Sequence, residues 1–223
     1  MATIIETPLL YPLVSADVAL FSVDHKSLRV LLVRRAQAPE ALQWALPGAV
    51  LRPEEDADLH ATACRALRDK VDVDVPYLAQ VGAFSGARRD PRGWSVSVLF
   101  YALLPGDQVQ AVVKSSIEAV EWFDASSPSC PLAFDHGELL GAALGMLRAK
   151  VERHALPLHL LSARFTLPEL QRTCEAVLAR PLDKSVFRRR LKDSEDIVEL
   201  AGEFAVGSQR PAQLYRARDG FVF

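Results

Sequence analysis

The sequence has few cysteines and no long apolar run, and both absences narrow the class of protein. Cys64, Cys130 and Cys174 are widely spaced among 223 residues, so they form neither a disulfide framework nor a metal-type cluster. No apolar stretch approaches the roughly 20 residues that a membrane-spanning helix needs. Residues 1–12 lack the basic start and apolar core of a secretory signal. We therefore expect a cytoplasmic protein with reduced cysteines and no membrane partner.

Acidic and basic residues are nearly balanced overall, but they are unevenly distributed. The chain has 26 Lys and Arg against 28 Asp and Glu, a net charge of −2. Between Arg180 and Lys192 there are six basic residues and one acid, Asp183. Such a stripe on one element is typical of binding to a polyanion, although a solvated helix face gives the same pattern.

The first part of the chain has the pattern of an α/β domain. Short β-branched, apolar segments at residues 13–23 and 28–33 predict two adjacent strands separated by a polar break. Strands interleaved with two helices indicate a sandwich with a mixed sheet over residues 1–155. The other expected elements are strands at 77–84, 95–104 and 118–123, and helices at 57–70 and 136–154.

A second domain is predicted over residues 156–223, after a linker near 155–164 where Pro157 interrupts the helical pattern. Thr166 and Glu169 fit a capping box at the start of a helix that Pro181 must end. Asp183 is a candidate cap for a second helix, from Lys184 to about Lys192. Two short helices joined by a tight turn indicate a helix-turn-helix. Strands at 197–201 and 213–216, joined by a turn at 202–211, would add a wing.

The second of these helices divides into an apolar and a basic face. We expect Val186, Phe187 and Leu191 to face the core. Lys184, Arg188 and Lys192 recur at i, i+4 and i+8, which is the outward stripe that a recognition helix needs. In the wing, Tyr215 is expected to pack against the core. The residues predicted to contact double-stranded DNA are Lys184, Ser185, Arg188, Arg189, Lys192, Arg210 and Gln213.

A loop and helix in the first domain resemble the Nudix hydrolase motif. Residues 44–50 resemble its Trp-x-Leu-Pro-Gly-Gly lead-in, with Ala49 in place of the second glycine, and Glu54 or Glu55 resembles the first acid. Residues 65–73 resemble the helical part, in which Arg65, Leu67 and Val73 match. Two extra residues separate the loop from Arg65.

Most of the acids of that motif are missing. Asp69 is a shortened substitute for one glutamate, Ala66 and Lys70 occupy the positions of two others, and Asp72 replaces a glycine. Mg²⁺ needs several oxygen ligands, and Lys70 would place a cation where the metal should lie. We therefore predict no metal site and no catalytic residue. No serine, cysteine or histidine arrangement indicates nucleophilic catalysis.

From about Leu13 to Arg216 the chain resembles the NrtR family of Nudix-related transcriptional regulators. Besides the altered Nudix motif, the resemblance is carried by residues 87–94, 131–136, 165–171, 181–189 and 210–216. It implies a Nudix-type α/β/α sandwich followed by a small winged helix. It also implies a homodimeric repressor of genes of NAD metabolism or related genes, which binds a palindromic operator. ADP-ribose or a related nucleotide would act as effector and not as a cofactor.

An effector of this kind carries a diphosphate, whose oxygens match guanidinium groups. Trp44 could stack on a base or simply pack, and the two glutamates could bind ribose hydroxyls or lie in solvent. Asp135 is more simply interpreted as the N-cap of the following helix. The candidate ligand-binding residues are Arg34, Arg35, Trp44, Glu54, Glu55, Arg65, Arg88 and Arg89.

Two other functions stay open at this point. The chain could be a weak Mg²⁺-dependent nucleoside-diphosphate or ADP-ribose hydrolase with an accessory domain, in which Glu54, Glu55 and Asp69 would be the metal ligands. It could also be a Nudix-like interaction module that binds no ligand.

Overall fold

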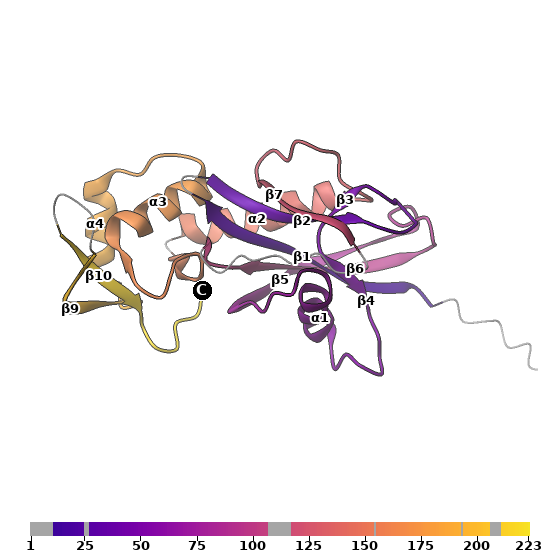
Figure 1. The fold of residues 1–223 in the computed structure, drawn as a ribbon, viewed down its shortest axis with the longest axis horizontal. Coiled ribbons are helices and arrows are strands. Elements are labelled where there is room, and N and C mark those ends of the chain that lie inside the picture. Colours follow the sequence, from indigo (N-terminus) through magenta and orange to yellow (C-terminus); the bar gives the residue numbers. More distant parts are fainter. Residues whose placement is uncertain (1–10, 25–26, 107–116, 154, 193, 206–210) are drawn as a thin grey trace, which may run out of the picture.

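The computed structural model describes residues 11–24, 27–106, 117–153, 155–192, 194–205 and 211–223. A seven-stranded sheet with two helices occupies one end of the elongated molecule, and a three-stranded sheet with two further helices occupies the other (Figure 1). We call these the N-terminal and C-terminal domains. Within the described residues, no helix is long and apolar enough to cross a lipid bilayer.

The large sheet is mixed, as the sequence predicted. Its central strand, β1 (Leu13–Asp24), pairs in parallel with β6 (Ser95–Leu103) and antiparallel with β2 (Ser27–Arg35). The strand order is β3-β2-β1-β6-β5, with β4 paired to β1 and β7 paired to β2. The remaining strands are β3 (Trp44–Ala45), β4 (Gly48–Val50), β5 (Tyr77–Gly86) and β7 (Ile117–Asp124).

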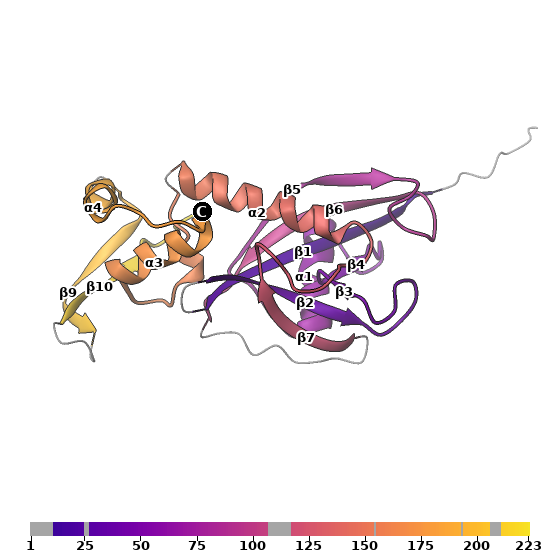
Figure 2. The ribbon, with the colours of Figure 1, turned by 90° about the horizontal axis from the view of Figure 1, so that it is seen from above.

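Two helices cover the two faces of this sheet, because side chains on β1 alternate between the faces. Val18 and Leu20 belong to an apolar cluster with α1 (Leu59–Val71). Phe21 belongs to a second cluster with α2 (His136–Glu152), which runs along the sheet toward the C-terminal domain (Figure 2). The predicted α/β/α sandwich is therefore confirmed.

The C-terminal domain has the predicted pair of helices and a three-stranded sheet in the order β8-β10-β9. Thr166 and Glu169 form the predicted capping box, and α3 ends before Pro181, at Ala179 in a left-handed conformation. The first wing strand is longer than predicted because pairing continues past Gly202, which takes a positive φ. The elements are η2 (Leu158–Leu160), β8 (Phe165–Thr166), α3 (Leu167–Leu178), α4 (Lys184–Lys192), β9 (Ile197–Ala205) and β10 (Ala212–Ala217).

The two domains share one continuous apolar cluster. Leu139 of α2 and Leu170 of α3 both belong to it. In the segment predicted as a linker, Leu156, Leu158 and Leu160 are buried, so its first part belongs to the core, whereas residues 162–164 are exposed. The reason is its leucine content, since apolar side chains are more stable when they are removed from water.

Candidate functional site

A cleft of about 670 Å³ lies between α1, β1, β2 and the loop after β5. Its volume is in the range of sites for small molecules. The cleft is predominantly cationic, because six basic side chains line it against three carboxylates, those of Asp17, Asp69 and Asp90. The basic residues are Arg35, Arg52, Arg65, Lys70, Arg89 and Arg92. A site of this charge favours an anionic ligand.

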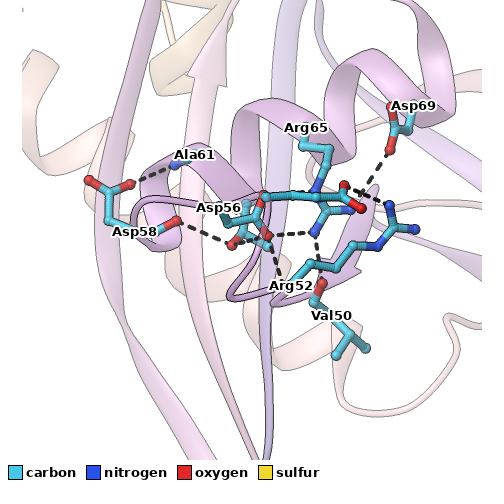
Figure 3. A network of polar contacts seen from close by, with 9 residues as sticks. Val50, Arg52, Asp56, Asp58, Ala61, Arg65 and Asp69 are labelled. Carbon is cyan, nitrogen blue, oxygen red and sulfur yellow. Dashed lines mark hydrogen bonds and ion pairs between the residues drawn. The ribbon is translucent and has the colours of Figure 1, made fainter.

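Arg65, on the side of α1 that lines the cleft, is held by the loop that precedes the helix (Figure 3). Its Nε and Nη2 donate to the two carboxylate oxygens of Asp56 at 2.8 and 2.6 Å, and Nη2 also donates to the carbonyl of Val50 at 2.8 Å. The guanidinium holds the pKa of the Asp56 carboxyl well below its usual range. Arg65 was predicted to bind the ligand. It lines the cleft, but these bonds show that it first of all holds the loop against the helix.

The α1 wall itself presents a methyl group and a cation. Ala66 and Lys70, which occupy two glutamate positions of the Nudix motif, both line the cleft one helical turn apart. Burial lowers the pKa of the Lys70 ammonium, and the nearby charge of Arg35 lowers it further. Asp69 is half-exposed, and its carboxylate lies 3.7 Å from the Arg65 guanidinium. Across the described part of the chain, no group of three or more His, Cys, Asp or Glu side chains is placed to hold a metal ion.

The floor of the cleft is built around a buried histidine. The N–H of Leu46 donates to Nδ1 of His136 at 2.9 Å, while Nε2 lies 3.8 Å from the carboxylate of Asp17. Burial lowers the pKa of this imidazole, which favours the neutral form with its proton on Nε2. A Cβ at Gly48 would lie 1.9 Å from the Asp17 carboxylate, so only glycine allows this close approach. The floor is therefore fixed before any ligand arrives.

The two arginines at the end of β2 have different surroundings. Neighbouring residues on a strand point to opposite faces, so only Arg35 lines the cleft. Its Nε donates to the carbonyl of Pro39 at 2.9 Å, and its guanidinium lies 4.8 Å from the ring centroid of Phe134. Burial lowers the pKa of this guanidinium, as does the charge of Arg92. Arg34 instead donates to the carbonyl of Leu42 and does not line the cleft, so only one of the two arginines predicted to bind the ligand lies there.

Two arginines of the loop after β5 are paired with carboxylates. Arg89 donates from Nε and Nη2 to both oxygens of Asp135, each at 2.9 Å. Asp135 stands at the N-cap position of α2, but within the described residues its side chain makes no capping hydrogen bond. The predicted position at the N-cap is confirmed, but the carboxylate is used in this ion pair and not in capping the helix. Arg92 pairs with Asp90 at 2.7 Å, yet its side chain stays 47% exposed at the cleft.

The other predicted ligand residues lie outside the cleft lining. Trp44 packs edge-on against Phe123, with ring centroids 4.9 Å apart, and so serves the core. Arg88, Glu54 and Glu55 are exposed, and Glu55 pairs with Arg52 at 2.9 Å. Five of the predicted ligand residues therefore do not line the cleft: Arg34, Trp44, Glu54, Glu55 and Arg88.

The predicted DNA-binding helix, α4, exposes its basic side. Phe187 and Leu191 are buried, and Asp183 caps the helix by accepting from the N–H groups of Ser185 and Val186 at 2.9 Å each. Val186 is 54% exposed, so its predicted core position is wrong. It directly precedes the buried Phe187, and successive residues of a helix point in different directions, so Val186 faces away from the core. Within the described residues, no carboxylate pairs with the exposed cations Lys184, Arg188, Arg189 and Lys192.

The wing contributes less to a DNA surface than the sequence suggested. The side-chain amide of Gln213 donates to the carbonyls of Leu200 and Glu203, so its donors hold the wing together and are not free for DNA. Arg210 lies outside the described residues. Tyr215 packs against the apolar core, as predicted.

Comparison with known proteins agrees with this geometry. The sequence model of the NUDIX domain matches residues 12–140, and that of the NrtR DNA-binding winged helix domain matches residues 157–217. The ADP-ribose-responsive transcriptional repressor NtrR of Acinetobacter baylyi is 43% identical over 206 residues, which cover 92% of this chain and 82% of that protein. The chain belongs to the NrtR family.

Solved structures of NrtR extend the likeness to three dimensions. Shewanella oneidensis NrtR complexed with a 27mer DNA is 34% identical, with a TM-score of 0.81, over 92% of this chain and 93% of that chain. The NUDIX domain of the same NrtR complexed with ADP-ribose is 35% identical, with a TM-score of 0.57, over 62% of this chain and 90% of that chain.

Sequence reasoning missed three cations of the cleft in this NrtR-family chain. Arg92 lies within residues 87–94, which carry the family resemblance, but it is not among the predicted ligand residues. For Lys70, the sequence predicted only that its cation would take the place of a metal ion. Arg52 lies between the Nudix-like lead-in at residues 44–50 and Glu54, and only the fold shows that it lines the cleft.

Proposed function

We propose that this protein is an ADP-ribose-responsive transcriptional repressor that binds DNA through α4. The observation that carries the proposal is the exposed stripe of Lys184, Arg188, Arg189 and Lys192, whose charges have no carboxylate partner among the described residues. The phosphates of DNA are the natural partners of such cations, and an α-helix fits the major groove. The Shewanella relative bound to DNA supports the same role.

We place the effector in the cationic cleft. A diphosphate carries two negative charges, and the groups best placed to meet them are Arg35, Arg52 and Arg92, with Lys70 on the α1 wall. The relative in Acinetobacter responds to ADP-ribose, and the NUDIX domain of Shewanella NrtR was solved with ADP-ribose. In this proposal ADP-ribose, or a related nucleotide, is an effector that reports on NAD metabolism, and the regulated genes belong to that metabolism.

We also propose that the cleft does not hydrolyse its ligand. Ala66 has no side-chain oxygen, and the Lys70 ammonium would repel a metal ion at the wall where Nudix hydrolases use glutamates. Because the described residues offer no carboxylate set for Mg²⁺, no metal neutralises the charge of the diphosphate or activates the attacking water. Mg²⁺ is therefore no cofactor in this proposal.

The protein would act as a homodimer in the cytoplasm, with two copies of α4 on a palindromic operator. Such half-sites lie one helical turn, roughly 34 Å, or a multiple of it apart. ADP-ribose would change DNA affinity only if it binds the DNA-bound and DNA-free arrangements unequally. The shared apolar cluster between the domains is the physical connection through which this difference would act.

Selection of binding sites from random duplexes by the full-length protein, followed by titration with and without ADP-ribose, tests the proposal. We expect a two-fold symmetric site and a shift in DNA affinity of about fivefold or more with ADP-ribose. Arg35→Gln should abolish this shift while leaving DNA affinity unchanged. Absence of sequence preference would reject the regulator, and an identical response in the variant would reject the cleft as effector site.

Hydrolysis is tested separately with ADP-ribose and Mg²⁺. We expect no turnover by the wild-type protein. Turnover that is lost in Asp69→Ala would overturn the non-catalytic proposal in favour of a hydrolase.

A further inference from the structure

A second cavity, of about 520 Å³, lies between the two domains. Its walls come from the end of the β1–β2 hairpin and β7 on one side, and from α3 and the segment leading into it on the other. The hairpin end points toward α3 in Figure 1. Among the described residues it shares no lining side chain with the cationic cleft. It is thus a separate compartment, and a ligand in it would touch both domains.

Two neighbouring strand residues bring unsatisfied polar atoms to this cavity. Ser22 of β1 and Arg29 of β2 are cross-strand partners, so their side chains lie on the same face of the sheet. Ser22 is only 4% exposed. Within the described structure, its Oγ and the Nε of Arg29 are buried and have no hydrogen-bond partner. Buried polar atoms are nearly always hydrogen-bonded, so this pair favours a ligand with acceptor atoms.

The charges around the cavity favour an anion. Arg29, Arg164 and Arg172 line it, together with the carboxylates of Asp24 and Glu169. The Glu169 carboxylate is already used, since it accepts from the N–H and Oγ of Thr166 at 2.7 and 2.8 Å.

Two of the three arginines are available to a ligand. Arg164 pairs with Glu203 at 2.6 Å. Arg29 and Arg172 have no ion-pair or hydrogen-bond partner in the described part of the chain. Guanidinium groups suit phosphate oxygens in geometry as well as in charge.

The remaining wall is aromatic and apolar. Trp122 of β7 is half-buried and lines the cavity, as do Leu160 and Leu161. A tryptophan beside arginines offers a surface for a flat ring attached to a phosphate. We propose that this cavity binds a nucleoside monophosphate, with its phosphate on Arg29 and Arg172, its base against Trp122, and an acceptor oxygen near Ser22.

The proposal is tested by calorimetric titration of AMP into the full-length Arg35→Gln protein, in which the cationic cleft is weakened. We expect one binding event per chain. Adding Arg29→Gln or Arg172→Gln should weaken it roughly tenfold or more, because each removes a charge-assisted hydrogen bond. Arg153→Gln, at an exposed arginine that follows the end of α2 and lies outside the cavity lining, is the matched control and should leave AMP affinity unchanged.

Two further measurements separate binding from folding and identify the ligand class. Ser22→Ala should weaken AMP binding while leaving the melting temperature of the free protein unchanged or raised, since it removes an unsatisfied buried hydroxyl. Ribose 5-phosphate should bind more weakly than AMP if the base contacts Trp122. Absence of AMP binding, or binding that neither arginine variant weakens, would overturn the site. Equal affinity for ribose 5-phosphate would overturn the nucleoside assignment.

Discussion

Replacing Arg188 by glutamine tests whether α4 binds DNA through its cationic stripe. Arg188 is exposed, and within the described residues no carboxylate pairs with it, so the substitution leaves no buried charge and breaks no ion pair. Glutamine keeps much of the length of the side chain and its helix propensity. We therefore expect the fold to persist and DNA binding to weaken.

The size of the effect follows from counterion release. Each α4 exposes four cations, Lys184, Arg188, Arg189 and Lys192, so a dimer could neutralise up to about eight phosphates, with a slope of log K against log salt near roughly −7. Losing one contact per protomer changes the slope to roughly −5.4. Between about 50 and 200 mM salt, the wild-type protein should lose roughly 10⁴-fold in affinity and the variant roughly 10³-fold.

Fluorescence anisotropy of a labelled operator, titrated at several salt concentrations, measures both quantities. Arg153→Gln is the matched control, since this exposed arginine directly follows α2 in the other domain. Its affinity and slope should equal those of the wild-type protein. If Arg188→Gln also leaves affinity and slope unchanged, α4 is not the DNA-binding helix.

Three further predictions concern the free energy of unfolding, which thermal or denaturant unfolding measures. His136 is buried with a lowered pKa, so the unfolded state takes up more protons as pH falls through its usual pKa of about 6.5; stability should drop there, and His136→Asn should remove that slope. Gly48→Ala should cost about 1–3 kcal/mol, because its Cβ would clash with Asp17; a neutral result would contradict the tight floor. Phe187→Ala, in the core, should cost about 3–5 kcal/mol. The exposed Val186→Ala should stay within about 0.5 kcal/mol, and equal losses would refute the face assignment of α4.

Features that depend on residues close in sequence were predictable. The capping box of Thr166 and Glu169, and the cap at Asp183, use donors and acceptors no more than three residues apart. Because side chains alternate between the two faces of a strand, the nearly continuous apolar run of β1 indicates a sheet covered on both sides. The mixed sheet and the pair of helices in the C-terminal domain follow from such local patterns.

Features that depend on distant partners were not predictable. Asp135 has the sequence position of a cap, and only the fold brings Arg89, 46 residues away, to its carboxylate. Arg34 and Arg35 are equivalent in sequence, but the pleat of β2 directs only one of them into the cleft. The cleft itself collects cations from several separate segments, and no spacing rule relates Arg52 to the others.

The buried contact between the domains limits how an effector signal could reach DNA. Domains joined by exposed linkers move freely, but here Leu156 and Leu158 are buried and Arg148 donates to the Val177 carbonyl at 2.9 Å. A large rotation of the C-terminal domain would expose this apolar surface to water, at about 25 cal/mol per Å². We therefore expect ADP-ribose to act through small shifts of α3 against α2, or through the arrangement of two whole protomers, with each protomer moving largely as one body.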